Sequence, residues 1–198
     1  MKIIIVGATG TLGKKVSNAF AQKHELIRVG RSSGDVQVDI TNESSIKAMF
    51  DKIGNFDALV STTGSGPFAP LNQMTGENFK TGLLDKLLGQ INLVLIGQHY
   101  INNNGSFTLT SGILSEHPVA AGSALSTING GLNAFVYAAS AELNNGVRIN
   151  AVSPNVVEDS PSYFDAFPGE IPVPMDKVVK AFEKSVLGIV SGQVIKVF

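Results

Sequence analysis

The chain has 198 residues, a formal net charge of −1 and no cysteine, and these features exclude several classes of protein. A chain of this length is expected to form one domain, residues 1–198, with a core that needs no metal or disulfide. Without cysteine there is no disulfide framework and no thiolate nucleophile. The near-neutral charge offers no basic surface for nucleic acid or an anionic membrane. We therefore expect a soluble, cytoplasmic protein without a metal site.

The N-terminal stretch carries the motif around which the rest of the chain is organised. Residues 2–6 are an apolar run rich in β-branched side chains, which predicts a buried strand and is too short for a signal peptide or a membrane span. Gly7, Gly10 and Gly13 follow, and residues 14–22 then show helical periodicity. Glycines let the backbone turn sharply, and the N–H groups of a helix N-terminus bind phosphate. The motif therefore predicts a pyrophosphate site.

Strands and helices are expected to alternate along the remaining chain. Apolar runs predict further strands at residues 26–30, 36–39, 56–60, 106–110, 147–152 and 194–198. Helices are expected after a cap at residue 41 or 42, and at residues 77–102, 123–145 and 176–187. Residues 102–105 read as a turn, and the proline-rich residues 161–174 as an irregular lid. This alternation predicts a Rossmann-type doubly wound parallel β-sheet of about seven strands with helices on both faces.

The end of the second predicted strand favours NADP(H) over NAD(H). At this point of a dinucleotide-binding fold an acid favours a free ribose 2′-hydroxyl, whereas an arginine favours a 2′-phosphate. The sequence has no acid at Gly30 and continues with Arg31, Ser32 and Ser33. NADP(H) is therefore the expected cofactor. The alternative is that Arg31 is a solvated arginine in a polar turn, which is the usual state of this residue type.

Seven segments resemble the short-chain dehydrogenase/reductase family, and together they span essentially the whole chain. They are residues 6–13, 38–41, 59–64, 108–111, 132–136, 147–154 and 191–194. The most specific is Arg-Ile-Asn-Ala-Val-Ser-Pro at residues 148–154. The resemblance implies that the cofactor contacts Gly7, Thr9, Gly10, Thr11, Leu12, Gly13, Arg31, Ser32, Asp39, Ile40, Ser61, Thr62, Thr63 and Pro154. Within this set Asp39 would meet the adenine amine, and Ile40 would pack on the adenine ring.

The same resemblance implies a degenerate catalytic site. Members of the family use a tyrosine, a lysine four residues later and a serine on the preceding strand for acid–base chemistry. Here Leu125 takes the tyrosine position and Asn129 the lysine position, while Ser111 keeps the serine position. Lys86 replaces an asparagine that supports a proton relay. The residues of the family pattern that bind the cofactor are thus mostly retained, whereas the catalytic tyrosine and lysine are replaced.

Three functions remain open from the sequence. The resemblance favours a non-catalytic NADP(H)-binding module, such as a sensor or partner subunit. The second is an NADP-dependent oxidoreductase of the carbonyl reductase or alcohol dehydrogenase type, in which Lys86, His117 or Tyr163 acts with Ser111 as a rearranged proton donor. Each of these three also has a plain interpretation: a surface or subunit-contact lysine, a loop histidine and a packed lid tyrosine. The third function is an interaction scaffold with a vestigial site.

The two long apolar helices predict self-association. The helices expected at residues 77–102 and 123–145 are apolar around most of their circumference, and exposed apolar patches of that size are uncommon on monomers. We therefore expect a homodimer or homotetramer. The remaining expected partners are the dinucleotide and a small-molecule carbonyl substrate.

Overall fold

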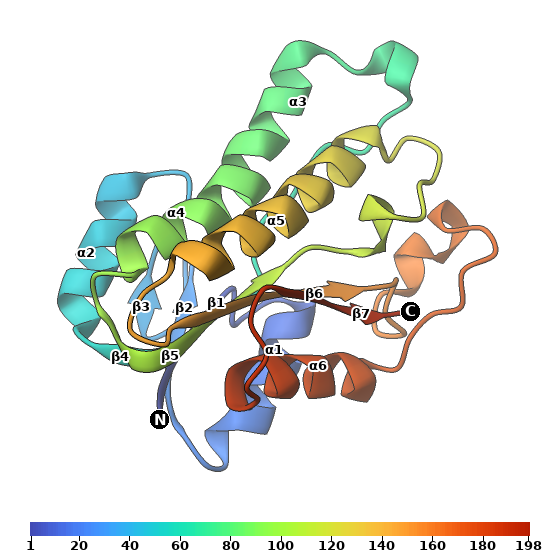
Figure 1. Ribbon diagram of the computed structural model, residues 1–198. Helices are drawn as coiled ribbons and strands as arrows, with labels where there is room; N and C mark the ends of the chain where they lie inside the picture. Colours follow the sequence, from blue (N-terminus) through green and yellow to red (C-terminus); the bar gives the residue numbers. More distant parts are fainter.

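Seven strands pair in parallel in a single sheet (Figure 1), as described by a computed structural model of residues 1–198. The strands are β1 (Lys2–Val6), β2 (Glu25–Gly30), β3 (Val36–Gln37), β4 (Phe56–Ser61), β5 (Ile101–Thr110), β6 (Arg148–Pro154) and β7 (Gln193–Val197). Their order across the sheet is β3-β2-β1-β4-β5-β6-β7, so the direction of winding reverses between β1 and β4. The predicted doubly wound sheet is confirmed. In such sheets ligands bind at this reversal, beyond the carboxyl ends of the strands.

Helices cover both faces of the sheet (Figure 1). Helices α1 (Thr11–Ala21) and α6 (Met175–Leu187) lie on one face, and α2 (Glu43–Ile53), α4 (Gly89–Gly97) and α5 (Ser123–Glu142) lie on the other. Two buried apolar clusters, of 19 and 17 residues, fill the spaces between the sheet and these two layers. Strand interiors that are apolar on both sides are typical of a parallel sheet covered in this way. None of the helices is both long enough and apolar enough to cross a membrane.

The most specific family-like segment has a structural role in β6. The guanidinium of Arg148 donates to the carbonyl of Ser185 near the end of α6, at 2.7 Å. Asn150 is fully buried, donates to the Val190 carbonyl at 2.9 Å and accepts from the Gln193 N–H at 3.0 Å. These bonds tie β6 to α6 and to β7. They anchor the first half of β6, whose carboxyl end lies beside the site described below.

The helix expected over residues 77–102 is divided and shorter. It consists of α3 (Gly76–Gly82), a π-helix η2 (Leu83–Leu88) and α4, which ends at Gly97. The prediction of one helix up to residue 102 is therefore wrong. Ile101 already belongs to β5, so the predicted end of the helix ran into the next strand.

Two strand boundaries also differ from the prediction. The expected turn at residues 102–105 lies inside β5 as a bulge: β4 advances from Phe56 to Ala58 while β5 advances from Ile101 to Ser106, and Asn104 adopts φ 61°. Asparagine tolerates this left-handed conformation because of its short polar side chain. Strand β3 contains only Val36 and Gln37, since the chain leaves the sheet edge before residue 39. Three short 3-10 turns, Leu71–Gln73, Ile113–Ser115 and Pro161–Ala166, complete the chain.

Candidate functional site

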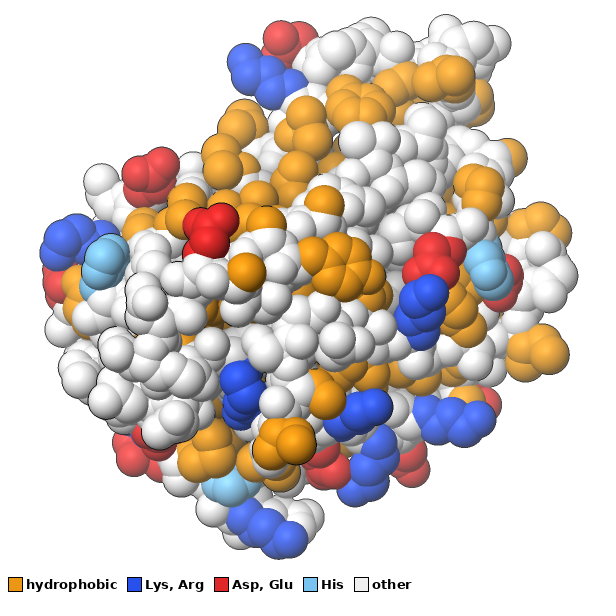
Figure 2. All heavy atoms as spheres, viewed as in Figure 1, with side chains coloured by type: hydrophobic (Ala, Val, Ile, Leu, Met, Phe, Trp, Pro, Cys, Tyr) orange, Lys and Arg blue, Asp and Glu red, His pale blue; other side chains and the backbone are white.

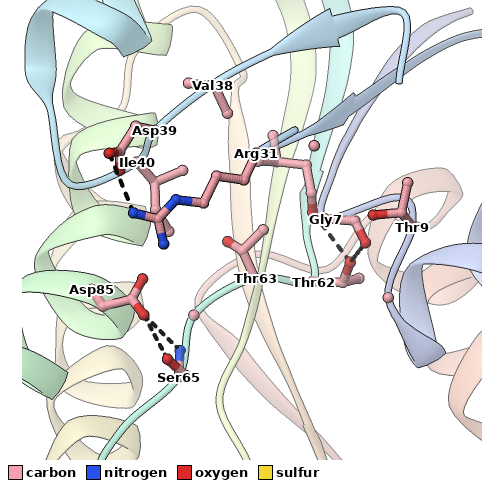
Figure 3. Close-up of a pocket in the computed structure, with 14 residues that line it drawn as sticks. Gly7, Thr9, Arg31, Val38, Asp39, Ile40, Thr62, Thr63, Ser65 and Asp85 are labelled. Atoms are coloured by element: carbon pink, nitrogen blue, oxygen red, sulfur yellow. Dashed lines mark hydrogen bonds and ion pairs between the residues drawn. The ribbon is translucent and has the colours of Figure 1, made fainter. Parts of the chain in front are cut away.

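A groove of about 350 Å³ lies where the winding of the sheet reverses. Its walls are the glycine turn after β1, the end of β2, residues 38–40 and the loop after β4 (Figure 3). The lining residues are Val6, Gly7, Thr9, Gly10, Gly30, Arg31, Val38, Asp39, Ile40, Thr62, Thr63, Gly64, Ser65 and Asp85. We call this hollow the switch groove.

The glycine turn is built from contacts that side chains would prevent. Gly7 has φ 86°, and a Cβ there would lie 2.6 Å from the Thr63 methyl group. A Cβ on Gly13 would collide with the Gly7 carbonyl oxygen. Gly10 starts α1 without a capping side chain, so the first N–H groups of this helix stay available to an anion. The turn therefore fits a pyrophosphate group.

Arg31 and Asp39 face each other at the outer end of the switch groove (Figure 3). The nearest guanidinium nitrogen and carboxylate oxygen are 3.6 Å apart, and the Arg31 side chain is 79% exposed. Hydrogen bonds from the Thr41 hydroxyl and the Thr41 N–H lower the pKa of Asp39, which keeps this carboxylate ionised. Exposed ion pairs of this kind contribute little to stability. Arg31 is therefore free to turn towards a more strongly charged anion.

The loop after β4 is tied down on both sides (Figure 3). The Thr62 hydroxyl donates to the Val6 carbonyl at 3.1 Å. Ser65 donates to the Asp85 carboxylate from its hydroxyl at 2.7 Å and from its N–H at 3.2 Å. Gly64 lies between these anchors with φ 98°, and a Cβ there would be 2.7 Å from the Lys86 Cα. The loop therefore packs closely against η2 at Lys86.

A second pocket of about 450 Å³ adjoins the switch groove, and the two hollows share the loop residues 62–65. Its apolar lining residues are Leu12, Phe68, Ile113, Leu114, Leu125, Val156, Val157, Tyr163 and Phe167. Lys86, Ser111 and Asn129 bring polar groups into the same pocket. The arrangement suits a largely apolar molecule that carries one polar centre.

The polar groups of the second pocket converge on two consecutive carbonyls. The Lys86 Nζ donates to the Ser111 carbonyl at 3.2 Å, and the Asn129 Nδ2 donates to the Gly112 carbonyl at 3.3 Å. Ser111 and Asn129 are 3% and 2% exposed, yet the Ser111 Oγ and the Asn129 Oδ1 have no hydrogen-bond partner. Because both residues line the second pocket, a polar ligand bound there would satisfy these two atoms. Burial lowers the pKa of Lys86 to about 8.

The other candidate residues are distributed around these hollows. Thr11, Leu12 and Pro154 line the second pocket, whereas Gly13, Ser32 and Ser61 line neither hollow. Gly13 packs α1 against the glycine turn, Ser32 is exposed, and Ser61 is fully buried with its hydroxyl 2.9 Å from the Thr63 hydroxyl.

The three alternative proton donors have different surroundings. His117 lines neither hollow and lies with its Nδ1 2.8 Å from the Glu170 Oε1. Tyr163 lines the second pocket but is 61% exposed. Lys86 is half-buried and bonded to Ser111, so its interpretation as a plain surface lysine is wrong. No three His, Asp or Glu side chains come together as metal ligands do.

Two residues of the site were missed from the sequence. Asp85 fixes the loop after β4, and its signal was the polar pair Asp85-Lys86 inside an otherwise leucine-rich helical run. Asn155 donates to the Glu170 carboxylate at 2.7 Å and so connects the end of β6 with the irregular segment that follows. No local sequence signal points to this bond.

The fold and the switch groove define a Rossmann-type α/β domain with a glycine-rich turn at its topological switch point. The family model described as Enoyl-(Acyl carrier protein) reductase matches residues 2–169. The chain therefore belongs to the short-chain dehydrogenase/reductase family. No curated protein matches it.

Solved structures cover the whole chain. The protein lin1944 from Listeria innocua is 48% identical with a TM-score of 0.98, and the match covers 100% of both chains. A small-chain dehydrogenase is 26% identical with a TM-score of 0.88, over 100% of this chain and 96% of the other. A small-chain dehydrogenase in complex with NADPH is 24% identical with a TM-score of 0.87, again over 100% and 96%.

Proposed function

We propose that the protein is an NADP(H)-dependent oxidoreductase acting on a carbonyl or alcohol group of a largely apolar small molecule. The observation that supports this is the shared wall of the two hollows, residues 62–65. A dinucleotide in the switch groove would lie next to a molecule in the second pocket. A protein that only sensed the cofactor would need no second pocket of this kind.

The chain offers a complementary group for each part of the dinucleotide. The glycine turn and the N-terminus of α1 would hold the pyrophosphate, and Asp39 and Ile40 the adenine. Arg31 would hold the 2′-phosphate that distinguishes NADP(H) from NAD(H). The NADPH complex of the small-chain dehydrogenase supports the binding of a nicotinamide dinucleotide.

Arg31→Ala is expected to weaken NADPH binding about tenfold or more and to change NADH binding less than about threefold, because only NADPH loses a charge-assisted hydrogen bond. Isothermal titration calorimetry of the purified protein measures both affinities. The matched control is Arg28→Ala, because Arg28 lies on β2, the strand that leads to Arg31, and lines neither hollow. Equal losses of affinity for NADPH and NADH, or a wild-type protein that binds NADH more tightly than NADPH, would contradict the assignment.

The reaction itself is tested by following NADPH oxidation with hexanal, cyclohexanone and phenanthrenequinone. At least one compound is expected to be reduced, and Ser111→Ala is expected to lower its kcat about tenfold or more without changing NADPH affinity. NADPH binding without any turnover would instead select the non-catalytic binding module. The observation that favours this second candidate is Leu125 and Asn129 in the positions of the family's tyrosine and lysine.

We further propose that the protein is a homodimer or homotetramer. Leu84, Leu88 and Leu95 are 44%, 40% and 47% exposed and follow one another at helical spacing along η2 and α4. Tyr137 on the neighbouring α5 is 58% exposed. Figure 2 shows hydrophobic side chains gathered over these helices. A second copy of this chain would cover them.

Leu88→Glu combined with Leu95→Glu is expected to convert the assembly to a monomer of 20.8 kDa, because the charges would be buried in the interface. Light scattering over a range of protein concentrations measures the mass. Ile189→Glu is the control, since Ile189 is 95% exposed on the segment after α6. A wild-type protein that stays monomeric at every concentration rules the assembly out.

A further inference from the structure

We propose that Lys86 donates the proton to the substrate oxygen in the second pocket, a role that a tyrosine fills elsewhere in the family. This inference rests on the proposed oxidoreductase function. When bound, NADPH would supply a hydride from a C–H bond of its dihydronicotinamide ring, which leaves NADP⁺ and forms the new C–H bond at the carbonyl carbon. The π electrons of the carbonyl move to its oxygen, and this oxygen takes a proton from the Lys86 ammonium group. The resulting neutral amine regains a proton from water.

The position of Lys86 depends on an unusual stretch of helix. Lys86 lies in the π-helix η2 between α3 and α4. Such segments change the direction in which side chains leave a helix and are frequent at functional sites. Here the Lys86 Nζ reaches the carbonyl of Ser111 at the end of β5, at 3.2 Å. Gly64 packs directly on the Lys86 Cα, so the backbone at Lys86 is held in place.

The surroundings of Lys86 favour release of a proton. No acid lines the second pocket, and the neighbouring Asp85 is already bonded to Ser65. The loop after β4, the end of β5 and the start of α5 contribute only uncharged residues to the pocket, and the one other titratable lining residue is Tyr163. Burial without an acidic partner lowers the pKa of Lys86 to about 8. An acid with a pKa near the working pH is suited to general acid catalysis.

Ser111 lines the second pocket, and its unpartnered hydroxyl would bind the substrate oxygen. This hydroxyl is buried and belongs to the same residue whose carbonyl accepts from Lys86. A carbonyl oxygen bound by the Ser111 hydroxyl would therefore lie close to the ammonium group. Leu125, in the tyrosine position, offers no competing acid.

Kinetics of single variants test the assignment, with NADPH and the carbonyl compound of the panel that the wild-type protein reduces best. Lys86→Met keeps the length of the side chain and is expected to lower kcat by about 100-fold or more while NADPH affinity changes less than about threefold. Wild-type kcat for reduction is expected to fall as the pH rises through about 8, because the ammonium form is the donor. The kcat of Lys86→Arg should not decrease over this pH range, since arginine stays protonated. Lys80→Met, at an exposed lysine of α3, is the matched control and should behave as wild type.

A second readout does not require turnover. Lysines labelled by reductive ¹³C-methylation are followed by NMR in the cofactor-free protein. One resonance, absent from Lys86→Met, is expected to titrate at about 8. A Lys86 resonance titrating above about 10, the ordinary lysine range, would overturn the inference even if NADPH binds. A Lys86→Met variant whose kcat stays within about threefold of wild type would also overturn the inference. If the wild-type protein does not bind NADPH, the proposed function itself is overturned.

Discussion

Gly13→Ala is expected to abolish NADPH binding and to lower the free energy of unfolding by roughly 3 to 5 kcal/mol. The new Cβ would collide with the Gly7 carbonyl oxygen and lie 2.8 Å from the Ala8 Cα. Gly7 cannot move aside easily, because its N–H donates to the Val29 carbonyl at 2.8 Å. Helix α1 must therefore shift away from β1, which disturbs its buried face and the phosphate-binding turn together.

Urea denaturation and calorimetric titration with NADPH measure the two effects of Gly13→Ala. The matched control is Gly76→Ala at the start of α3, where a Cβ meets nothing within 4 Å. The control should retain wild-type NADPH affinity and change stability by less than about 1 kcal/mol. If Gly13→Ala bound NADPH with wild-type affinity, the close approach of α1 to the turn would not be required for cofactor binding.

Asn129→Lys is expected to lower the free energy of unfolding by roughly 2 to 4 kcal/mol at pH 7, although it restores the family's lysine position. Asn129 is 2% exposed and bonds to the Gly112 carbonyl, next to the Ser111 carbonyl that Lys86 occupies. The substitution would place a second cation beside the first, in a pocket without an acid. Urea denaturation measures the loss.

The double variant Lys86→Asn with Asn129→Lys tests whether the two positions are coupled. It removes the repulsion, so it should be more stable than the sum of the single effects by about 1 to 2 kcal/mol. The loss caused by Asn129→Lys alone should shrink as the pH rises through about 8, because Lys86 then becomes neutral in the folded protein. Additive single effects and a loss independent of pH would show that the two side chains do not interact.

The sequence by itself determined the fold and the location of the switch groove. Apolar β-branched runs such as residues 2–6 specify strands locally, and Gly7, Gly10 and Gly13 specify a turn that few other residues could form. Arg31 could be placed at the groove because it follows directly on a strand whose carboxyl end meets the ribose in dinucleotide-binding folds. Asp39 could be placed there through the resemblance to the family.

Only the tertiary structure decided how the second pocket is arranged. The apolar spacing of the leucine-rich run fits one continuous helix, so nothing local announced η2 or the direction of Lys86. That direction depends on Gly64 and on the bond from Ser65 to Asp85, which joins residues 20 positions apart. His117 likewise lies outside both hollows, where it contacts Glu170, 53 residues later in the sequence. The periodicity of apolar residues shows which face of a helix is buried. Contacts between distant segments determine where a polar side chain lies.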